Sequence, residues 1–591
     1  MKRDLRFDQV KTSPVSGRGT LHHSHLWENF LDWNPQLFRE LKGKLKTKNV
    51  IIAAAISVII QFVCVINLLG DLPDPDPQGK FGIQYGRYGM GYVEYSRDDY
   101  YRESLPYTKD LLDNWVVNWQ LLWLDLFIIL SVISIFALLI VGTYMLVADL
   151  AKEESQGTLN FIRLTPQSAG DILLGKILGV PILLYAVICL FLPLHTIAGI
   201  NARIPLNLIL SFDGVIVASC AFFYSLALLC SLLDFGLSGF KPWLISGVIG
   251  SVLFILTQNL FHGDYLKLNN PLGWLFLFNP SLVLSYLIDA THLPDSKVGF
   301  LPVENLQQLL FYGRAFWAEA AVGIGFIIFN LSIWTYWSWT LLKRRFDRQD
   351  STFISKVQSY WLTGWFIAIA LGFTLQSNTQ NINSEYFIFL QVFLVVWGLG
   401  LTAGLSPHRQ KLHDWARYRH QTANNSIWHE LVFGKNSPST VAVAINLAIA
   451  IAYIMPSIFI YLDRDKHQIL WGLIISAGNI ILCAIIAQIA LMLKTRKRAA
   501  LSIITVASIV VVPPVCMGMA NIHLHDTPVA WMFSFIPTVA VEYVSMPTIA
   551  LTLLGQWLVI ATIGLQMSRK LKQAGASETK MLMTRAKALN S

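Results

Sequence analysis

Charged side chains are scarce in this chain. Asp, Glu, Lys and Arg together make up 14% of its 591 residues, whereas hydrophobic residues make up 54%. A soluble domain usually carries about 25% charged residues, so the composition argues against a soluble protein. Apolar runs of about 20 residues recur, and each is long enough to cross a ~30 Å hydrocarbon core as a helix. Because the short alternating segments of a membrane β-barrel are missing, we predict an all-α polytopic membrane protein.

Cysteine is also scarce, and none of the six cysteines has the spacing of a metal site. All six lie inside apolar runs, where we interpret them as small buried hydrophobic residues. We therefore expect no metal and no cofactor on this chain. The N-terminal stretch is polar and basic and the first apolar run is already a full span, so no cleavable signal peptide is expected.

The net charge of +9 does not indicate nucleic-acid binding. The basic residues lie mostly in short loops beside apolar runs, and no basic stripe is interleaved with exposed aromatic residues. With the N-terminus inside, the inner segments hold roughly three times as many Lys and Arg as the outer segments. We therefore expect a multi-pass protein of a bacterial plasma membrane, in contact with the lipid bilayer, with both termini cytoplasmic.

The apolar runs predict about twelve spans. Their approximate limits are 50–69, 119–148, 177–199, 207–232, 242–261, 318–341, 359–375, 386–404, 439–461, 468–492, 500–518 and 547–567.

Four regions are expected along the chain: an N-terminal arm at 1–48, a six-span membrane domain at 49–345, a second membrane half at 346–568 and a basic tail at 569–591. Apolar stretches broken by proline lie at corresponding positions before the sixth and last spans, which suggests two related halves. Six core spans with extra helices remain the alternative.

The N-terminal arm is predicted to contain an amphipathic helix on the inner membrane surface. Asn34 is a suitable N-cap and Pro35 a suitable first residue, and Leu37, Leu41 and Leu45 share one face. A solvated basic arm is the alternative. The external loop 70–118 would contact substrate, cap the spans or lie in solvent.

The inner loop 150–176 carries the most informative pattern. Gly157 is expected to end the preceding helical segment, and a short amphipathic helix follows. Thr165-Pro166 ends that helix, because proline disfavours a helical conformation of the residue before it. Ser168 would cap the next helix. Such an element suits docking into a groove of a soluble partner. The residues expected at this contact are Glu153, Glu154, Gly157, Thr158, Leu159, Phe161, Leu164, Thr165 and Pro166.

This loop resembles the coupling-helix region of type-2 ABC (ATP-binding-cassette) exporter permeases. Gly157-Thr158-Leu159, Thr165-Pro166 and Leu174-Gly175-Lys176 match the family pattern without insertion over about 25 residues. The resemblance implies that 49–345 is a type-2 ABC permease-like domain. It also implies a separate ATPase subunit that binds ATP and Mg²⁺, and no catalytic residue on this chain. A second permease copy is an open possibility.

The chain departs from the family pattern in two respects. Asn160 stands where the family often has Glu, and the second half lacks a Gly-Thr-Leu element. The loop 405–438 could offer another contact to the ATPase. The frame Gly170–Ile177 has the glycines and lysine of a phosphate-binding loop, but it lacks the required Ser or Thr and a preceding strand.

Two other functions compete with the permease interpretation. An ion-driven secondary transporter of twelve spans would need mid-span carboxylates, which are scarce. A membrane enzyme or an assembly factor would need a cluster of His, Asp or Cys at one face, and the candidates around 408–429 are too loosely spaced. Acidic residues at predicted span ends, such as Asp125, are interpreted as snorkelling. Deeper polar residues could line a translocation path or join helices by hydrogen bonds. The path candidates are Gln258, Asn259, Asn330 and Asn446.

Overall fold

The computed structural model describes thirteen stretches of the chain. They are 33–73, 85–90, 105–106, 108–109, 115–232, 239–262, 270–293, 298–348, 351–376, 383–421, 426–462, 465–495 and 497–575. The N-terminal residues before 33, most of the predicted external loop and the tail after 575 lie outside the described residues.

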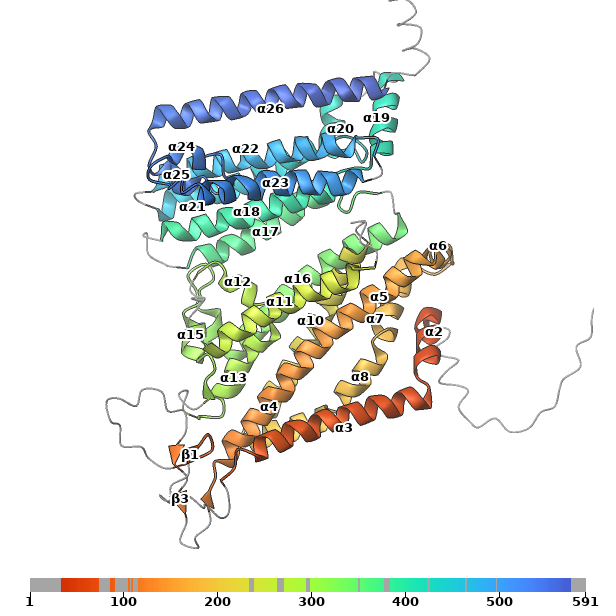
Figure 1. The fold of residues 1–591 in the computed structure, drawn as a ribbon, viewed down its shortest axis with the longest axis vertical. Helices are drawn as coiled ribbons and strands as arrows, with labels where there is room; N and C mark the ends of the chain where they lie inside the picture. Colours follow the sequence, from red (N-terminus) through yellow and green to blue (C-terminus); the bar gives the residue numbers. More distant parts are fainter. Residues whose placement is uncertain are drawn as a thin grey trace, which may run out of the picture.

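Long helices make up both halves of the chain and run roughly parallel to one another (Figure 1). The first half contains α3 (Thr47–Leu69), α4 (Trp119–Phe136), α5 (Gly142–Ser155), α8 (Ile182–Cys189), α9 (Leu192–Asn201), α10 (Leu206–Ser231), α11 (Lys241–His262) and α16 (Ala320–Asp347). The second contains α17 (Lys356–Thr374), α18 (Ser384–Leu405), α21 (Thr440–Tyr461), α22 (Lys466–Leu491), α23 (Arg498–Met519) and α26 (Met546–Gly575).

Short elements cover the two ends of the bundle (Figure 1). At one end lie α2 (Pro35–Lys44), α6 (Thr158–Arg163), α7 (Ala169–Gly179), α19 (Arg409–Gln421) and α20 (Ile427–Phe433). At the other lie α12 (Gly273–Phe276), η2 (Pro280–Val283), α13 (Leu284–Asp289), α15 (Val303–Gln307), η3 (Phe316–Ala318), α24 (Pro528–Trp531) and α25 (Thr538–Val541). The strands there are β1 (Tyr85–Gly86), β2 (Leu105–Pro106), β3 (Thr108–Lys109) and β4 (Trp115–Val116), in two antiparallel pairs.

The prediction of an all-α polytopic membrane protein is confirmed. Among the described residues, 11 helices are long and apolar enough to cross a membrane. The seventh predicted span, 359–375, corresponds to α17, which begins with the polar stretch Lys356–Ser359 and is not among the 11. It nevertheless packs against α18 and α21 and runs alongside them (Figure 1).

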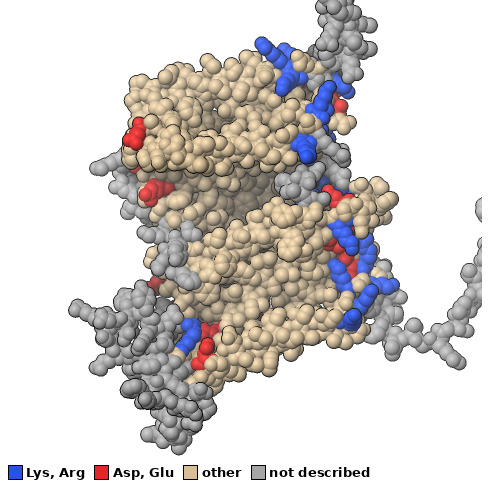
Figure 2. All heavy atoms as spheres, in the orientation of Figure 1, with Lys and Arg blue, Asp and Glu red and all other residues tan. Residues whose placement is uncertain are grey.

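Lys and Arg gather at the end formed by α2, α6, α7, α19 and α20, which we call the basic end (Figure 2). Acidic residues dominate the opposite end in the same view. Because charges are costly inside a hydrocarbon layer, the bare surface between the two ends matches the predicted membrane-spanning region.

The third predicted span, 177–199, begins differently from the prediction. Helix α7 ends at Gly179, and Pro181 separates it from α8 because proline lacks the N–H that would continue the helix. The spanning segment is Ile182–Asn201. Lys176 therefore lies on a separate helix at the basic end.

The longest spanning segment, Trp119–Ser155, has 37 residues and consists of α4, the π-helical turn η1 (Ala137–Val141) and α5. Tyr224 of α10 donates a hydrogen bond to the Leu138 carbonyl at 2.8 Å, where the π turn changes the helical ladder. At 1.5 Å per residue the segment is about 55 Å long, which exceeds the ~45 Å of a whole bilayer with headgroups. Figure 1 shows α4 and α5 running obliquely to helices such as α22 and α23, and such a tilt accommodates the extra length.

Aromatic side chains join the two halves in the middle of the bundle. The Trp274 ring lies 5.6 Å from Phe366 and 5.8 Å from Phe393, and the Phe366 ring stacks on Trp397 at 4.2 Å between centroids. Figure 2 shows the surface hollowed between the halves beyond this contact. The halves share one apolar core, and near the opposite end the N–H groups of Tyr312 and Gly313 donate to the Gly372 and Leu375 carbonyls, both at 2.9 Å.

The proline-broken apolar segment before the sixth span, residues 272–290, is folded back into the opposite end of the first half. Asn279 is fully buried, caps η2 through Ser281 N–H and donates to Thr257 Oγ1 of α11 at 3.0 Å. These bonds satisfy the polar groups exposed by the helix break.

Asp125 was expected to snorkel, and that interpretation is wrong. Its carboxylate is buried and accepts two hydrogen bonds from the Arg87 guanidinium, at 2.6 and 2.8 Å, and one from the Tyr88 hydroxyl at 3.0 Å. Burial, followed by the negative charge of Asp125, raises the pKa of Tyr88, so the phenol keeps its proton. This part of the loop 70–118 therefore caps the spans, one of the three roles considered for it.

We expect Arg87→Ala to destabilise the protein by about 3 kcal/mol, because it leaves the Asp125 carboxylate buried without its cation. The double variant R87A/D125N should be more stable than R87A. The midpoint of thermal unfolding in detergent checks both. Equal midpoints for the two variants would show that the ion pair does not hold the loop.

Candidate functional site

The short helix α6 stands at the tip of the basic end, where α5 leaves the membrane region (Figure 1). Gly157 adopts φ +72°, a left-handed conformation that glycine takes without strain, and separates α5 from α6. Ser168 caps α7 by accepting the Asp171 N–H at 3.1 Å. The predicted order of break, short helix and capped second helix is therefore present.

Helix α6 has one face inside the protein and one in solvent. Leu159 and Ile162 are buried in a small core made with side chains of α5, α7, α10 and α16. Phe161 and Leu164 are 75% and 82% exposed. The inner pair fixes the helix to its base, so the outer pair is held in a defined position.

Arg163 links α6 to the end of α16. Its guanidinium lies 5.0 Å from the centre of the Phe346 ring, a distance at which a cation is attracted to the π face. Burial lowers the pKa of Arg163 from its usual value. A displacement of α6 would therefore act on α16 through this contact and the small core.

A network of charges fixes α5, α7 and α2 to one another. Lys176 of α7 is 1% exposed, and its ammonium lies 2.6 Å from Asp149 Oδ2 and 2.7 Å from Glu153 Oε2, both on α5. Arg39 of α2 binds the other oxygen of Glu153 at 2.9 Å. Lys44, one turn further along α2, pairs with Glu40 at 3.1 Å.

Oxygen atoms of Glu40, Asp149 and Glu153 lie within 4.8 Å of one another, as in a site for a divalent cation. The Lys176 ammonium already binds two of the three carboxylates. The cluster is therefore an ion-pair network with an internal cation.

Helix α2 lies against α7 at unusually short range. A Cβ on Gly175 would come within 2.7 Å of Asn34 Oδ1, and one on Gly179 within 2.5 Å of Glu40 Cβ. Asn34 caps α2 as predicted and also donates to the Asp171 carbonyl at 2.7 Å. The two glycines let the helix backbones approach closely enough for the charge network to form.

The predicted face of α2 is only partly the one that packs. Leu37 is buried together with Gln36 and Glu40, whereas Leu41 is half-buried and Leu45 is exposed. The helix lies across the end of the bundle, nearly perpendicular to α3 (Figure 1). Polar contacts with α7, such as the Asn34–Asp171 hydrogen bond, therefore hold α2 in addition to the apolar stripe on which the prediction was based.

The two acidic residues expected to face a partner differ in exposure. Glu153 is buried in the network, whereas Glu154 is exposed and binds Lys241 at 3.2 Å. Thr158 donates to the Glu153 carbonyl at 3.2 Å, and Thr165 to the Ile162 carbonyl at 2.6 Å. Of the nine expected contact residues, Leu159 is buried and Gly157, Thr158, Phe161, Leu164, Thr165 and Pro166 are exposed.

The four residues proposed for a translocation path do not converge. Asn446 joins α21 to α17 by accepting from Thr363 at 2.7 Å and donating to Ser359 at 2.9 Å. Asn330 accepts from the Trp274 indole at 3.2 Å, and Asn259 donates to a carbonyl of its own helix. Asn446 and Asn330 thus act as links between elements, the second of the two predicted roles.

Gln258 is exposed on α11. A cavity of about 320 Å³ between α10 and α16 is lined by six described residues, among them Thr335 and Trp339, and by none of the four path candidates.

No protein-family model matches the chain, and neither a curated protein nor a solved structure matches it. The permease assignment therefore depends on the loop 150–176 and on the geometry around α6.

The partners of Glu153 and Glu154 could not be found from the sequence. In the sequence, Lys176 is only the last residue of the Leu174-Gly175-Lys176 pattern. No pattern assigns a role to Arg39 or Lys241. The available signal was that Lys176 adjoins an apolar run and Asp149 lies at the end of another, since charges in such places usually have a partner.

We expect Lys176→Ala to lower stability by about 3 kcal/mol or more, because Asp149 and Glu153 lose the cation buried between them. Added Ca²⁺ should raise the unfolding midpoint of this variant, since it can take the vacated place among the carboxylate oxygens.

Lys241→Ala is the matched control, because Lys241 is also buried but, among the described residues, pairs with a single carboxylate, that of Glu154. Added Ca²⁺ should not raise the unfolding midpoint of K241A. If K176A and K241A respond alike to Ca²⁺ and to EDTA, the ammonium does not occupy a cation position.

We expect Gly157→Asn to be tolerated and Gly157→Val to displace α6, because asparagine adopts φ > 0 far more readily than a β-branched residue. A Cβ at this position meets no atom within 4 Å, so backbone conformation alone separates the two variants. Protease cleavage within 153–166 should accelerate in G157V and not in G157N. Equal cleavage would mean that the left-handed turn does not set the position of α6.

Proposed function

We propose that this chain is the membrane-spanning permease subunit of an ATP-driven ABC exporter, with its basic end in the cytoplasm. The observation that carries the proposal is the exposed apolar pair Phe161 and Leu164 on a helix that is fixed from behind. A separate ATPase subunit would bind this pair.

The position of α6 supports docking to a soluble protein. Helix α6 follows the last residue of the spanning segment Trp119–Ser155 and stands at the end where Lys and Arg gather, which supports a position on the aqueous side because charges are costly inside hydrocarbon. Burying Phe161 and Leu164 in a partner groove would contribute about 1.5–3 kcal/mol for each side chain. Short helices with apolar anchors on one face are a recurring recognition element.

The contacts behind α6 support its role as a lever. Helix α5 continues through η1 into α4, the charge network links α5 to α7 and α2, and the small core reaches α10 and α16. A partner that moves α6 would therefore move several spans together as a rigid body. That is the motion needed to switch access between the two sides of a membrane.

The environment of the Gly170–Ile177 frame supports placing ATP and Mg²⁺ on the partner. The segment lies in α7, Gly175 packs against Asn34, and Lys176 is bound by carboxylates. Neither the glycine nor the lysine is free to hold a phosphate.

A second contact on the ATPase is proposed for α20, in the predicted loop 405–438. Trp428 is 68% exposed on this helix, and Phe433 is also exposed. Glu430 fixes the helix from behind through Trp415 and Arg419, at 3.0 and 3.1 Å. This arrangement, an exposed aromatic on a braced short helix, repeats that of α6 in the second half.

The test is to purify the chain from its native membrane in mild detergent and to measure bound ATPase activity. We expect F161A/L164A to retain at most about a tenth of the activity bound by the unmodified chain, since two anchor side chains each contribute about 1–2 kcal/mol.

The control is F329A/L210A, which removes an exposed Phe and an exposed Leu from the spans. It should retain the bound activity. No bound ATPase on the unmodified chain, or equal recovery in both variants, contradicts the proposal. Transport that stops with an uncoupler and continues without ATP would instead favour the ion-driven alternative.

A further inference from the structure

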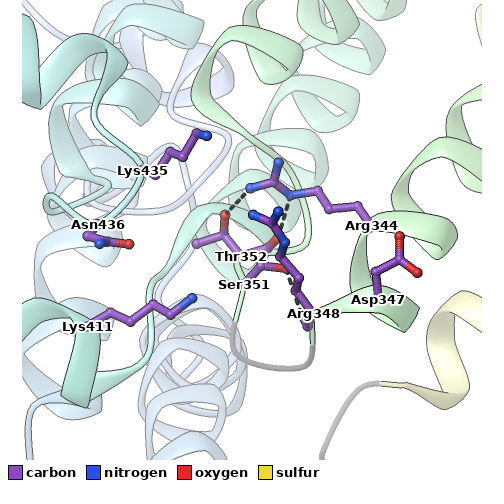
Figure 3. Close-up of a pocket in the computed structure, with 8 residues that line it drawn as sticks. All are labelled: Arg344, Asp347, Arg348, Ser351, Thr352, Lys411, Lys435 and Asn436. Carbon is purple, nitrogen blue, oxygen red and sulfur yellow. Dashed lines mark hydrogen bonds between the residues drawn. The ribbon is translucent and has the colours of Figure 1, made fainter. Parts of the chain in front are cut away.

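A cavity of about 440 Å³ lies at the basic end, where the two halves meet (Figure 3). It is lined by the end of α16, the linker to α17, α19 and the turn between α20 and α21. All eight described lining residues are polar or charged. The volume is within the roughly 300–1,000 Å³ of small-molecule sites, and the lining excludes an apolar ligand.

Four cations surround this cavity. Arg344 and Arg348 come from the first half and its linker, and Lys411 and Lys435 come from the second half. Figure 3 shows the four side chains directed toward a common space, with Asp347 at the edge away from the two lysines. None of the four is in an ion pair closer than 4.0 Å among the described residues.

Like charges gathered in a hollow repel one another until an anion enters. A phosphate group accepts charge-assisted hydrogen bonds from Arg and Lys together, and its charge would offset that repulsion. Asp347 is the one carboxylate among the described lining residues, so four cations face a single anion around this cavity.

Part of the site is already positioned. Arg344 donates from Nε to the Thr352 carbonyl at 3.1 Å and from Nη2 to Thr352 Oγ1 at 3.4 Å. On the other side, the Lys356 ammonium binds Ser437 Oγ at 2.7 Å, next to Asn436. The guanidinium and the turn that carries Lys435 are thus held before a ligand arrives.

The depth of the cavity indicates where the phosphate comes from. Arg344 and Asp347 are in the last turn of α16, a spanning helix of 28 residues. The end of such a helix lies at the level of lipid headgroups, where basic pockets between membrane helices bind anionic lipids.

We propose that this cavity binds the phosphate headgroup of an anionic phospholipid from the leaflet at the basic end, with the acyl chains remaining outside. The headgroup joins cations of both halves and stabilises their junction. The proposal does not depend on the ATPase.

The test is native mass spectrometry of the full chain in detergent, with phosphatidylglycerol and phosphatidylcholine of identical acyl chains as probes. We expect one phosphatidylglycerol to bind at least about tenfold more tightly than phosphatidylcholine. The variant R348A/K411A/K435A should lose that preference. The control K48A/K494A/K497A removes three exposed cations of the same end and should keep it.

A second arm distinguishes a lipid from a soluble phosphate. If millimolar glycerol 3-phosphate displaces phosphatidylglycerol and raises the unfolding midpoint of the unmodified chain but not of R348A/K411A/K435A, the phosphate site stands and its ligand is water-soluble. If neither probe distinguishes R348A/K411A/K435A from the control, the cavity is not a phosphate site and the proposal is overturned.

Discussion

The arrangement of the basic end depends on one buried ammonium group. Lys176 is almost inaccessible to solvent and is bound by Asp149 and Glu153. Removing a charge from water costs several kcal/mol, and only well-placed opposite charges offset that cost. The position of α7 relative to α5 is therefore restricted to the one that brings these groups together, and α2 is held to the same position through Arg39. Because α6 packs on α5 and α7, the packing of these helices also sets the direction in which the exposed face of α6 points.

The spans and the order of elements in the coupling loop could be predicted from local sequence. An apolar run of about 20 residues has few alternatives to a membrane helix, and Gly157 and Pro166 limit a short helix whatever surrounds it. The one predicted span that was less apolar than the others, α17, has 19 residues and begins with Lys356. Its lysine is satisfied by oxygen atoms of the turn before α21, including Ser437 Oγ, which a local pattern does not show.

Contacts between distant charges could not be predicted. Arg39 and Glu153 are 114 positions apart, and Asn34 and Asp171 are 137 apart. The sequence places Glu153 and Glu154 next to the short helix and therefore suggests that both belong to a docking surface. In the folded protein Glu153 is buried. Asp125 was misinterpreted for the same reason, because its partner Arg87 lies in a loop whose path is not encoded by periodicity.

The two halves are joined differently at their middle and at their basic end, and this difference bears on how a lever could act. In the middle, the Trp274 ring of the first half packs against Phe366 and Phe393 of the second half, and this contact tolerates small rotations because ring packing is not directional in the way that hydrogen bonds are. At the basic end, Arg344 of the first half and Lys411 of the second half line the same polar cavity. A junction made of cations holds only while an anion lies between them, so its stiffness depends on occupancy. A movement of α6, transmitted through Phe346 to the last turn of α16, would reach this junction before it reached the aromatic contact.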